Sequence, residues 1–176
     1  MLSPTIETER LILRRYKESD IDAIYDIITD ERLSTYIYFP SLTKEEELDA
    51  IRQWIKDADV SKYEKWVIEL KDDGSVIGNI SVNTVVNKHN YCNVGYVLRY
   101  AYWGNGYASE ALKAVSDYLL NSRGYYLVEC SCNENNAQSI KVMLKAGFKK
   151  DGYVANRRLN NDGTYSGIEY YSKTKK

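Results

Sequence analysis

The order of apolar and polar positions along the chain predicts alternating strands and helices, with no stretch that reads as a linker. In the first half, apolar residues at helical spacing predict one helix that begins near Ser19 and a second that begins near Thr43. Glu46 follows Thr43 at the spacing of a capping box. Runs of β-branched and aromatic residues predict strands over residues 11–16, 66–70, 76–82 and 92–99.

The second half alternates strands and helices more regularly. A turn that contains Gly104 and Gly106 leads into a helix whose apolar face runs from Ala108 to Leu119. After it we expect a strand over 126–132, a helix over 136–145 and strands over 148–154 and 165–172. This order predicts an α/β (α+β) fold in which about seven strands share one sheet and about four helices cover both faces. The whole chain, residues 1–176, is expected to form a single domain.

The charge balance argues against nucleic acids and membranes as partners. The 24 basic and 25 acidic residues nearly cancel, so the chain has no overall attraction for phosphate backbones or anionic lipid. No apolar run approaches the ~18 residues of a membrane span, and acids and arginines interrupt the N-terminal segment where a secretory signal needs apolar residues. We therefore expect a globular protein of the cytoplasm.

The cysteines and the single histidine do not suggest a metal site. Cys92, Cys130 and Cys132 are an odd number in a chain long enough to fold without disulfides, so free buried thiols are expected. His89 lies in a polar stretch that predicts a solvated turn. Zinc needs more ligands than these residues offer at such spacings, and no metal is expected.

The segment from Val94 to Leu112 carries the strongest chemical signal. A strand runs into the turn with Gly104 and Gly106, and the turn opens a helix. Glycines let successive backbone N–H groups converge, and a helix start adds unpaired donors, so the turn predicts an anion site, most simply for phosphate. A plain tight turn is the alternative. A P-loop and a dinucleotide fingerprint fit badly, because no Gly-Lys-Ser/Thr follows and Ser109 stands where a third glycine is required.

This segment resembles a known family, the GNAT N-acetyltransferases. Their acyl-CoA motif, Arg/Gln-x-x-Gly-x-Gly/Ala, is similar to residues 103–108, with Trp103 in place of Arg or Gln. The continuation into Glu-Ala is typical of the branch that contains the ribosomal-protein N-terminal acetyltransferases. Weaker matches in the same order lie at residues 7–14, 77–80, 95–98, 133–139 and 147–148. The resemblance implies one mixed, mostly antiparallel sheet, splayed at its centre by a bulge in the strand over residues 92–99.

The resemblance also implies acetyl-CoA, with coenzyme A as product, as the bound cofactor. We expect the diphosphate on the backbone amides of the glycine turn and the pantetheine arm beside the backbone of Val97 and Leu98. Asn136 matches a position that contacts this arm, although asparagine is also a favoured helix N-cap. The implied cofactor-binding residues are Val97, Leu98, Trp103, Gly104, Asn105, Gly106, Tyr107, Ala108, Ser109, Asn136 and Ser139.

Direct transfer of an acetyl group needs a proton source for the leaving thiolate. Many relatives place a tyrosine seven residues after the position of Asn136, where this chain has Met143, which has no proton to donate. Ser139 matches a serine that the ribosomal-protein branch uses near the sulfur, and it becomes the candidate donor. Packing of a small residue between helix and sheet is the alternative role for Ser139.

The amine must also lose a proton, and the candidates for this step are Glu129, Asn93 and solvent. Asn93 stands where relatives commonly carry a carboxylate, and an amide is not a base, so Asn93 would orient water or substrate. Glu129 serves as base if it faces the cleft. A water chain is the alternative, because an α-amine with a pKa of about 7.7–8.0 is already partly neutral in the cytoplasm.

The acceptor is expected to contact Tyr36, Tyr38 and Phe39, together with the loop over residues 157–165, because the family uses these regions for specificity. The resemblance favours the N-terminal amine of a protein such as a ribosomal protein. A small amine, polyamine, amino acid or antibiotic is the main alternative acceptor, and both monomer and homodimer stay open. A non-catalytic acyl-CoA sensor and a nucleotide-binding enzyme are the alternative functions.

Overall fold

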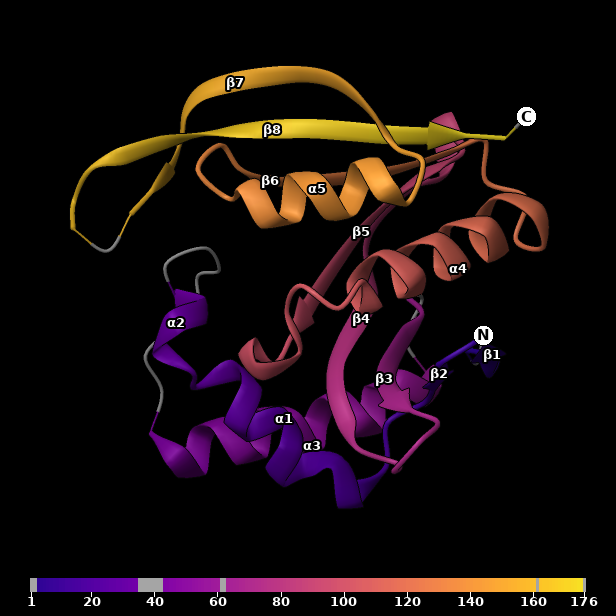
Figure 1. The fold of residues 1–176 in the computed structure, drawn as a ribbon, viewed down its shortest axis with the longest axis vertical. Coiled ribbons are helices and arrows are strands. Elements are labelled where there is room, and N and C mark those ends of the chain that lie inside the picture. Colours follow the sequence, from indigo (N-terminus) through magenta and orange to yellow (C-terminus); the bar gives the residue numbers. More distant parts are fainter. Residues whose placement is uncertain (1–2, 35–42, 61–62, 161, 176) are drawn as a thin grey trace.

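The structure, a computed structural model, describes residues 3–34, 43–60, 63–160 and 162–175. Within them, eight strands form one sheet in the order β1-β2-β3-β4-β5-β6-β8-β7 (Figure 1). The strands are β1 (Ile6–Glu7), β2 (Leu11–Arg14), β3 (Lys65–Leu70), β4 (Val76–Val86), β5 (Tyr91–Leu98), β6 (Leu127–Asn133), β7 (Lys149–Leu159) and β8 (Tyr165–Thr174). The helices are α1 (Ile21–Ile28), α2 (Glu31–Ser34), α3 (Lys44–Val60), α4 (Tyr107–Asn121) and α5 (Ala137–Lys145).

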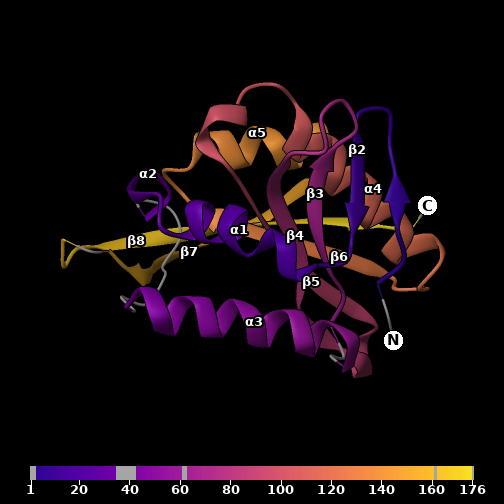
Figure 2. The same ribbon diagram turned by 90° about the horizontal axis from the view of Figure 1, so that it is seen from below.

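Helices cover both faces of the sheet, and each face has its own apolar core (Figures 1 and 2). Alternation along β3 shows the division: Trp66 and Ile68 belong to the core under α4 and α5, whereas Val67 packs with Ile24 of α1 and Ile51 of α3. All five side chains are fully buried. The mixed α/β fold with helices on both faces is therefore confirmed.

The sheet divides at its centre, between β5 and β6. These two strands are parallel, and they pair only over Tyr91–Asn93 and Leu127–Glu129. All other neighbouring strands pair in the antiparallel sense. Beyond Asn93 and Glu129, β5 stays with β4 and β6 stays with β8, so the two halves of the sheet separate (Figure 1). The expected central splay is present.

The irregularity beside this split lies on β4 and not, as expected, within β5. The register between the two strands shifts between Val82 and Thr84, which face Val94 and Asn93. Asn83 is therefore the extra residue of the pair, and β5 itself continues without an insertion. A bulge that depends on the partner strand leaves no mark in the sequence of β5.

The other differences from the predicted elements concern short segments. β1 has two residues and α2 has four, which is too short to leave a periodic pattern. The first helix begins after Asp20, one residue beyond the expected cap at Ser19, because a 3-10 turn over Glu18–Asp20 precedes it. The Asp20 carboxylate closes this turn by accepting from the Lys17 amide at 2.7 Å, and it also accepts two hydrogen bonds from the Arg14 guanidinium, at 2.8 and 2.9 Å. The second helix has its predicted capping box, with the Thr43 amide donating to Glu46 Oε2 at 2.8 Å.

All three cysteines are free and buried, as expected. In the described part of the chain, no three His, Cys, Asp or Glu side chains gather closely enough to hold a metal ion. Over the same residues, no helix combines the length and the apolar character needed to cross a bilayer.

Candidate active site

A cavity of about 620 Å³ occupies the split between β5 and β6. Its lining comes from both faces of the sheet. On the face of α4 and α5 it includes the glycine turn, Tyr96, Cys132 and the first turns of α5. On the opposite face it includes polar side chains of β4 and β6 and Leu33 of α2. The cavity therefore connects two chemically different surfaces through the sheet.

The glycine turn forms one end of this cavity. Gly104 has a φ of 81° and Gly106 has a φ of 83°, in the left-handed region that disfavours residues with a Cβ. Gly106 is also the N-cap of α4, so the unpaired amides of the first turn of this helix begin here. The geometry supports the predicted anion site on both counts.

Asn105, between the two glycines, does not line the cavity. Its side-chain amide donates to the carbonyl oxygens of Tyr102 and Trp103, at 3.3 and 3.2 Å. Its own carbonyl oxygen accepts a hydrogen bond of 3.0 Å from Arg10. Asn105 therefore braces the turn, whereas the glycines around it are the residues that line the cavity.

The loop between β1 and β2 holds the first turn of α4 in place. Glu110 accepts hydrogen bonds from Thr8 Oγ1 at 2.6 Å, from the Arg10 amide at 2.9 Å and from Arg10 Nε at 2.8 Å. The Arg10 guanidinium also lies over the Tyr107 ring, 4.4 Å from its centroid. Burial raises the pKa of Glu110, but the hydrogen bonds from Thr8 and Arg10 outweigh it and lower the pKa overall.

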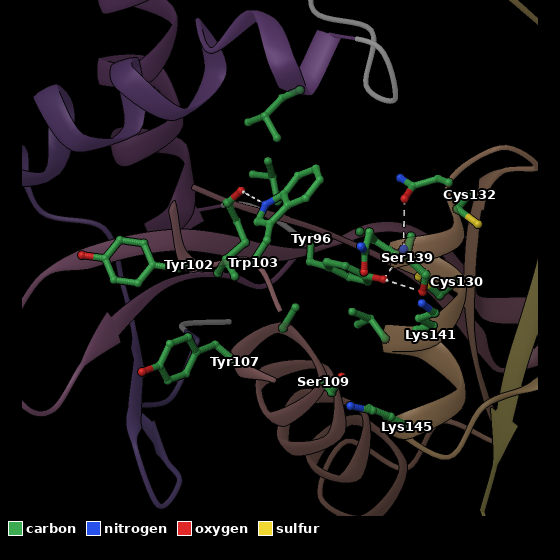
Figure 3. A pocket seen from close by; sticks show the side chains of 18 of the residues that line it. Tyr96, Tyr102, Trp103, Tyr107, Ser109, Cys130, Cys132, Ser139, Lys141 and Lys145 are labelled. Carbon is green, nitrogen blue, oxygen red and sulfur yellow. Dashed lines mark hydrogen bonds between the residues drawn. The ribbon is translucent and has the colours of Figure 1, made fainter. Parts of the chain in front are cut away.

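Positive charge lies near the glycine turn. Among the described residues that line the cavity, Lys141 and Lys145 of α5 are the only ones with a charged side chain. Figure 3 places Lys145 close to Ser109, in the first turn of α4. The amides of the turn, the start of α4 and two ammonium groups thus favour a ligand with several negative charges at this end.

The edge of β5 offers backbone groups to the cavity unequally. The Leu98 carbonyl oxygen accepts a hydrogen bond of 2.7 Å from Trp103 Nε1 (Figure 3). The Val97 carbonyl oxygen lies against Gly78 of β4, within 2.3 Å of where a Cβ on that glycine would be, so it points away from the split. Both residues line the cavity, as expected, and Trp103 fixes how β5 meets the glycine turn.

The start of α5 brings several hydrogen-bonding groups to the middle of the cavity. Asn136 is the N-cap, and its Oδ1 accepts from the Ser139 amide at 3.0 Å, so the capping role holds. The Ser139 hydroxyl lies 2.7 Å from the hydroxyl of Tyr96, which reaches it from β5 (Figure 3). Cys132 also lines the cavity, close enough for Ser139 to lower the pKa of its thiol.

The titratable groups in the middle of the cavity keep their protons at neutral pH. Burial raises the pKa of Tyr96 well above its ordinary value, despite the hydrogen bond with Ser139. Burial also raises the pKa of Cys132 to about 11 and that of Cys130 to about 12. These groups are neutral hydrogen-bond donors and not bases.

The opposite end of the cavity is polar and uncharged. Its polar lining residues there are Asn79, Ser81 and Asn83 of β4 with Ser131 and Asn133 of β6. Ser81 Oγ donates to Asn83 Oδ1 at 2.9 Å, and the Asn83 amide lies over Gly95, where a Cβ would come within 2.4 Å of its nitrogen. This end suits a neutral ligand that makes hydrogen bonds.

Glu129 and Asn93 lie next to this polar end but do not line the cavity. They face each other at the last paired position of β5 and β6, and Asn93 Nδ2 donates to Glu129 Oε1 at 2.9 Å. Glu129 points to the same face as Ser131, two residues further along β6. The candidate base is therefore on the side of the sheet opposite α4 and α5, held by the amide.

Some expected residues cannot be placed in the cavity, and some residues of the cavity were not expected. Tyr36, Tyr38 and Phe39 lie outside the described residues, directly after α2. Residues of the cavity that the sequence did not single out include Tyr96, Asn83, Lys141 and Lys145. The i, i+4 spacing of the two lysines on the helix after Asn136 is the one signal that would have revealed any of them.

Comparisons with known proteins agree with this architecture. Residues 10–149 match the family model described as the acetyltransferase (GNAT) domain. The uncharacterized N-acetyltransferase YoaA of Bacillus subtilis is 28% identical over 173 residues, which cover 98% of this chain and 97% of that protein. The ribosomal-protein-serine acetyltransferase of Escherichia coli is 25% identical over 170 residues, 94% of this chain and 93% of that protein. RimL, a ribosomal L7/L12 alpha-N-protein acetyltransferase solved with coenzyme A, superposes with a TM-score of 0.85 over 97% of this chain and 98% of its own. The two sequences are 19% identical, so the comparison shows a shared fold.

Proposed function

The chain belongs to the GNAT family of acetyltransferases, and we propose that it transfers the acetyl group of acetyl-CoA to the N-terminal α-amine of a protein, as the ribosomal-protein acetyltransferases do. The observation that carries this proposal is the cavity through the split sheet. One end has donors and cations for an anionic ligand, and the other end has neutral polar side chains. An enzyme that joins two substrates needs such a path between two binding surfaces.

The residues at the glycine turn fit the phosphate groups of coenzyme A. Glycine backbone at positive φ, the first turn of α4 and the ammonium groups of Lys141 and Lys145 all favour an anion here. The proposed cofactor-binding set is Val97, Leu98, Trp103, Gly104, Gly106, Tyr107, Ala108, Ser109, Asn136 and Ser139, with Asn105 as a brace. Bound there, acetyl-CoA supplies an activated thioester.

Residues at the middle of the cavity would orient the thioester and protonate the leaving thiolate. Ser139 is the proposed proton donor, and its position is fixed because the Asn136 side chain caps α5 through the Ser139 amide. Met143, on the same helix, is fully buried in the core and contributes no polar group. Ser139 is thus the residue of α5 that presents a hydroxyl to the cavity.

The polar end supports an α-amine as acceptor more than a polyamine. A polyamine carries several positive charges, and no carboxylate is found among the described lining residues to pair with them. An α-amine has a pKa of about 7.7–8.0 and is partly neutral without a strong base, whereas a lysine amine has a pKa of about 10.4. Tyr36, Tyr38 and Phe39 remain the proposed acceptor contacts, on the resemblance alone.

The test is an acceptor panel with thiol release from acetyl-CoA as the readout. Peptides that begin with serine, alanine or methionine are compared with the same peptides blocked at the α-amine but carrying lysine, and with spermidine, amino acids and an aminoglycoside. Mass spectrometry locates the acetyl group. We expect free α-amines to have the highest kcat/KM and blocked peptides to lose at least tenfold.

Two results would contradict the proposal. A small amine or polyamine used at least tenfold better than every peptide would reassign the acceptor. Tight coenzyme A binding with no acceptor-dependent thiol release on any amine would instead favour a non-catalytic acyl-CoA sensor.

A further inference from the structure

Tyr96 and Ser139 form a close pair of hydroxyls in the middle of the cavity. Tyr96 Oη lies 2.7 Å from Ser139 Oγ and 3.2 Å from the Ser139 carbonyl oxygen. The two residues come from different elements, β5 and α5, and both line the cavity (Figure 3). The pair therefore lies in the cavity lining between the glycine turn and the polar end.

A serine hydroxyl is a weak acid, and by itself it has no means of replacing a proton that it gives away. A second hydroxyl within hydrogen-bonding distance removes this difficulty, because one proton can move in as the other moves out. Among the described lining residues, Tyr96 is the only tyrosine with a hydrogen bond to Ser139. Tyr102 and Tyr107 line the cavity nearer the glycine turn (Figure 3).

We propose that Tyr96 is a positioning residue that supplies the proton which Ser139 delivers to the leaving thiolate. This inference rests on the proposed function. As the N–C bond to the amine forms, the C–S bond breaks and sulfur leaves with the electron pair. Sulfur takes the Ser139 proton, Ser139 takes the Tyr96 proton, and the phenolate regains one from solvent, which receives the proton lost by the amine.

The surroundings of Tyr96 fit this role. Its ring packs against the core under α4 and α5, which fixes the hydroxyl in direction. Burial raises the pKa of its phenol well above the ordinary value, so the proton is present throughout the working pH range. The Cys132 thiol of β6 also lies near Ser139, and burial raises its pKa to about 11.

The test compares Tyr96→Phe, Ser139→Ala and the double variant with the parent chain. Tyr118→Phe is the matched control, because the Tyr118 hydroxyl also hydrogen-bonds a side chain, that of Glu64 at 2.6 Å, and Tyr118 lies outside the cavity lining. We expect Tyr96→Phe to lower kcat about tenfold to a hundredfold with KM for acetyl-CoA unchanged. The double variant should be no worse than Ser139→Ala, since the two hydroxyls act as one unit.

A second readout needs no turnover. Ultraviolet absorbance follows ionisation of the thiol of bound coenzyme A as pH is raised. A hydroxyl pair that hydrogen-bonds the thiolate lowers the thiol pKa, so Tyr96→Phe should raise it by about one unit, while Tyr118→Phe leaves it unchanged. A purely structural role for Tyr96 changes melting temperature but not this titration.

The outcomes separate the two proposals. If Tyr96→Phe keeps the parental kcat and the parental thiol titration, Tyr96 has no part in proton supply. If the losses of the single variants multiply in the double variant, the two hydroxyls act independently and the relay is refuted. If the parent chain acetylates no acceptor, the proposed function fails, and the titration of bound coenzyme A still decides the role of Tyr96.

Discussion

The pH dependence of acetyl transfer should follow the acceptor amine and not a group of the enzyme. The described lining of the cavity contains no carboxylate and no imidazole. Its tyrosine and cysteine nearest the centre, Tyr96 and Cys132, have raised pKa values and do not lose protons at neutral pH. The protonation state that controls the rate below pH 9 or so is therefore that of the incoming amine.

The size of the effect follows from the reference pKa values. At about pH 7, about 14% of an α-amine with a pKa near 7.8 is neutral, against about 0.04% of a lysine amine with a pKa near 10.4. For equal binding, the neutral fraction alone favours the α-amine by a factor of about 350. For either acceptor, kcat/KM should rise tenfold per pH unit below the amine pKa and level off above it.

The assay measures kcat/KM by thiol release from about pH 6 to about pH 10, with one peptide that has a free α-amine and one that is blocked and carries a lysine. The free α-amine should show an inflection near about pH 7.8, whereas kcat/KM for the lysine peptide, whose amine pKa is about 2.6 units higher, should still be rising at about pH 10. An inflection that stays at the same pH for both, in the usual range of a carboxylate or an imidazole, would refute the reasoning. Glu129→Gln then identifies the source, because a base at Glu129 gives an inflection that this variant removes.

Three further predictions concern the glycine turn and its supports. Gly106→Glu should weaken coenzyme A binding, measured by calorimetry, by more than a hundredfold, and Gly106→Ala should weaken it by less. Gly124→Ala is the control, because Gly124 has a φ of 78° and no atom within 4 Å of an added Cβ. This variant bears the same backbone strain of about 1–2 kcal/mol and should leave the affinity for coenzyme A unchanged. Changing Lys141 and Lys145 together to Gln should weaken coenzyme A about tenfold and reduce the salt dependence of binding, while phosphate-free pantetheine binds as before. The lowered pKa of Glu110 stabilises the folded protein above the ordinary pKa of a carboxylate, and this stabilisation is lost as pH falls through the pKa of Glu110 in the folded state. In Glu110→Gln, melting temperature should therefore fall less steeply as pH is lowered.

The order of helices and strands was predictable because the longer elements have regularly spaced apolar residues. The apolar face of α4, from Ala111 to Leu119, and the capping box of α3 are local features that the fold did not override. The position of Asn83 was not predictable, because a bulge depends on the register between two strands and not on either sequence. The start of α1 differed by one residue because the Asp20 carboxylate accepts from the Lys17 amide and closes a 3-10 turn before the helix.

The part of the candidate site formed by consecutive residues was predictable, whereas the parts formed by residues distant along the chain were not. Gly104, Gly106 and the start of α4 are consecutive, so the candidate anion site could be inferred from sequence, and the structure shows both glycines at positive φ before the helix. The partner of Ser139 could not, since Tyr96 lies 43 residues away along the chain on a strand whose facing was unknown. Glu129 shows the same limit, because only the register of β5 and β6 places it against Asn93.

The split of the sheet explains why the chemistry depends on such distant pairs. A continuous sheet would keep the face of α4 and α5 apart from the face of α1 and α3, with the backbone between them. Pairing of β5 and β6 stops at Asn93 and Glu129, so side chains that alternate to opposite faces further along, such as Cys132 and Ser131, line one cavity. In the proposed function, the phosphate groups and the acceptor approach from the two ends of this cavity, and Ser139 lies between them.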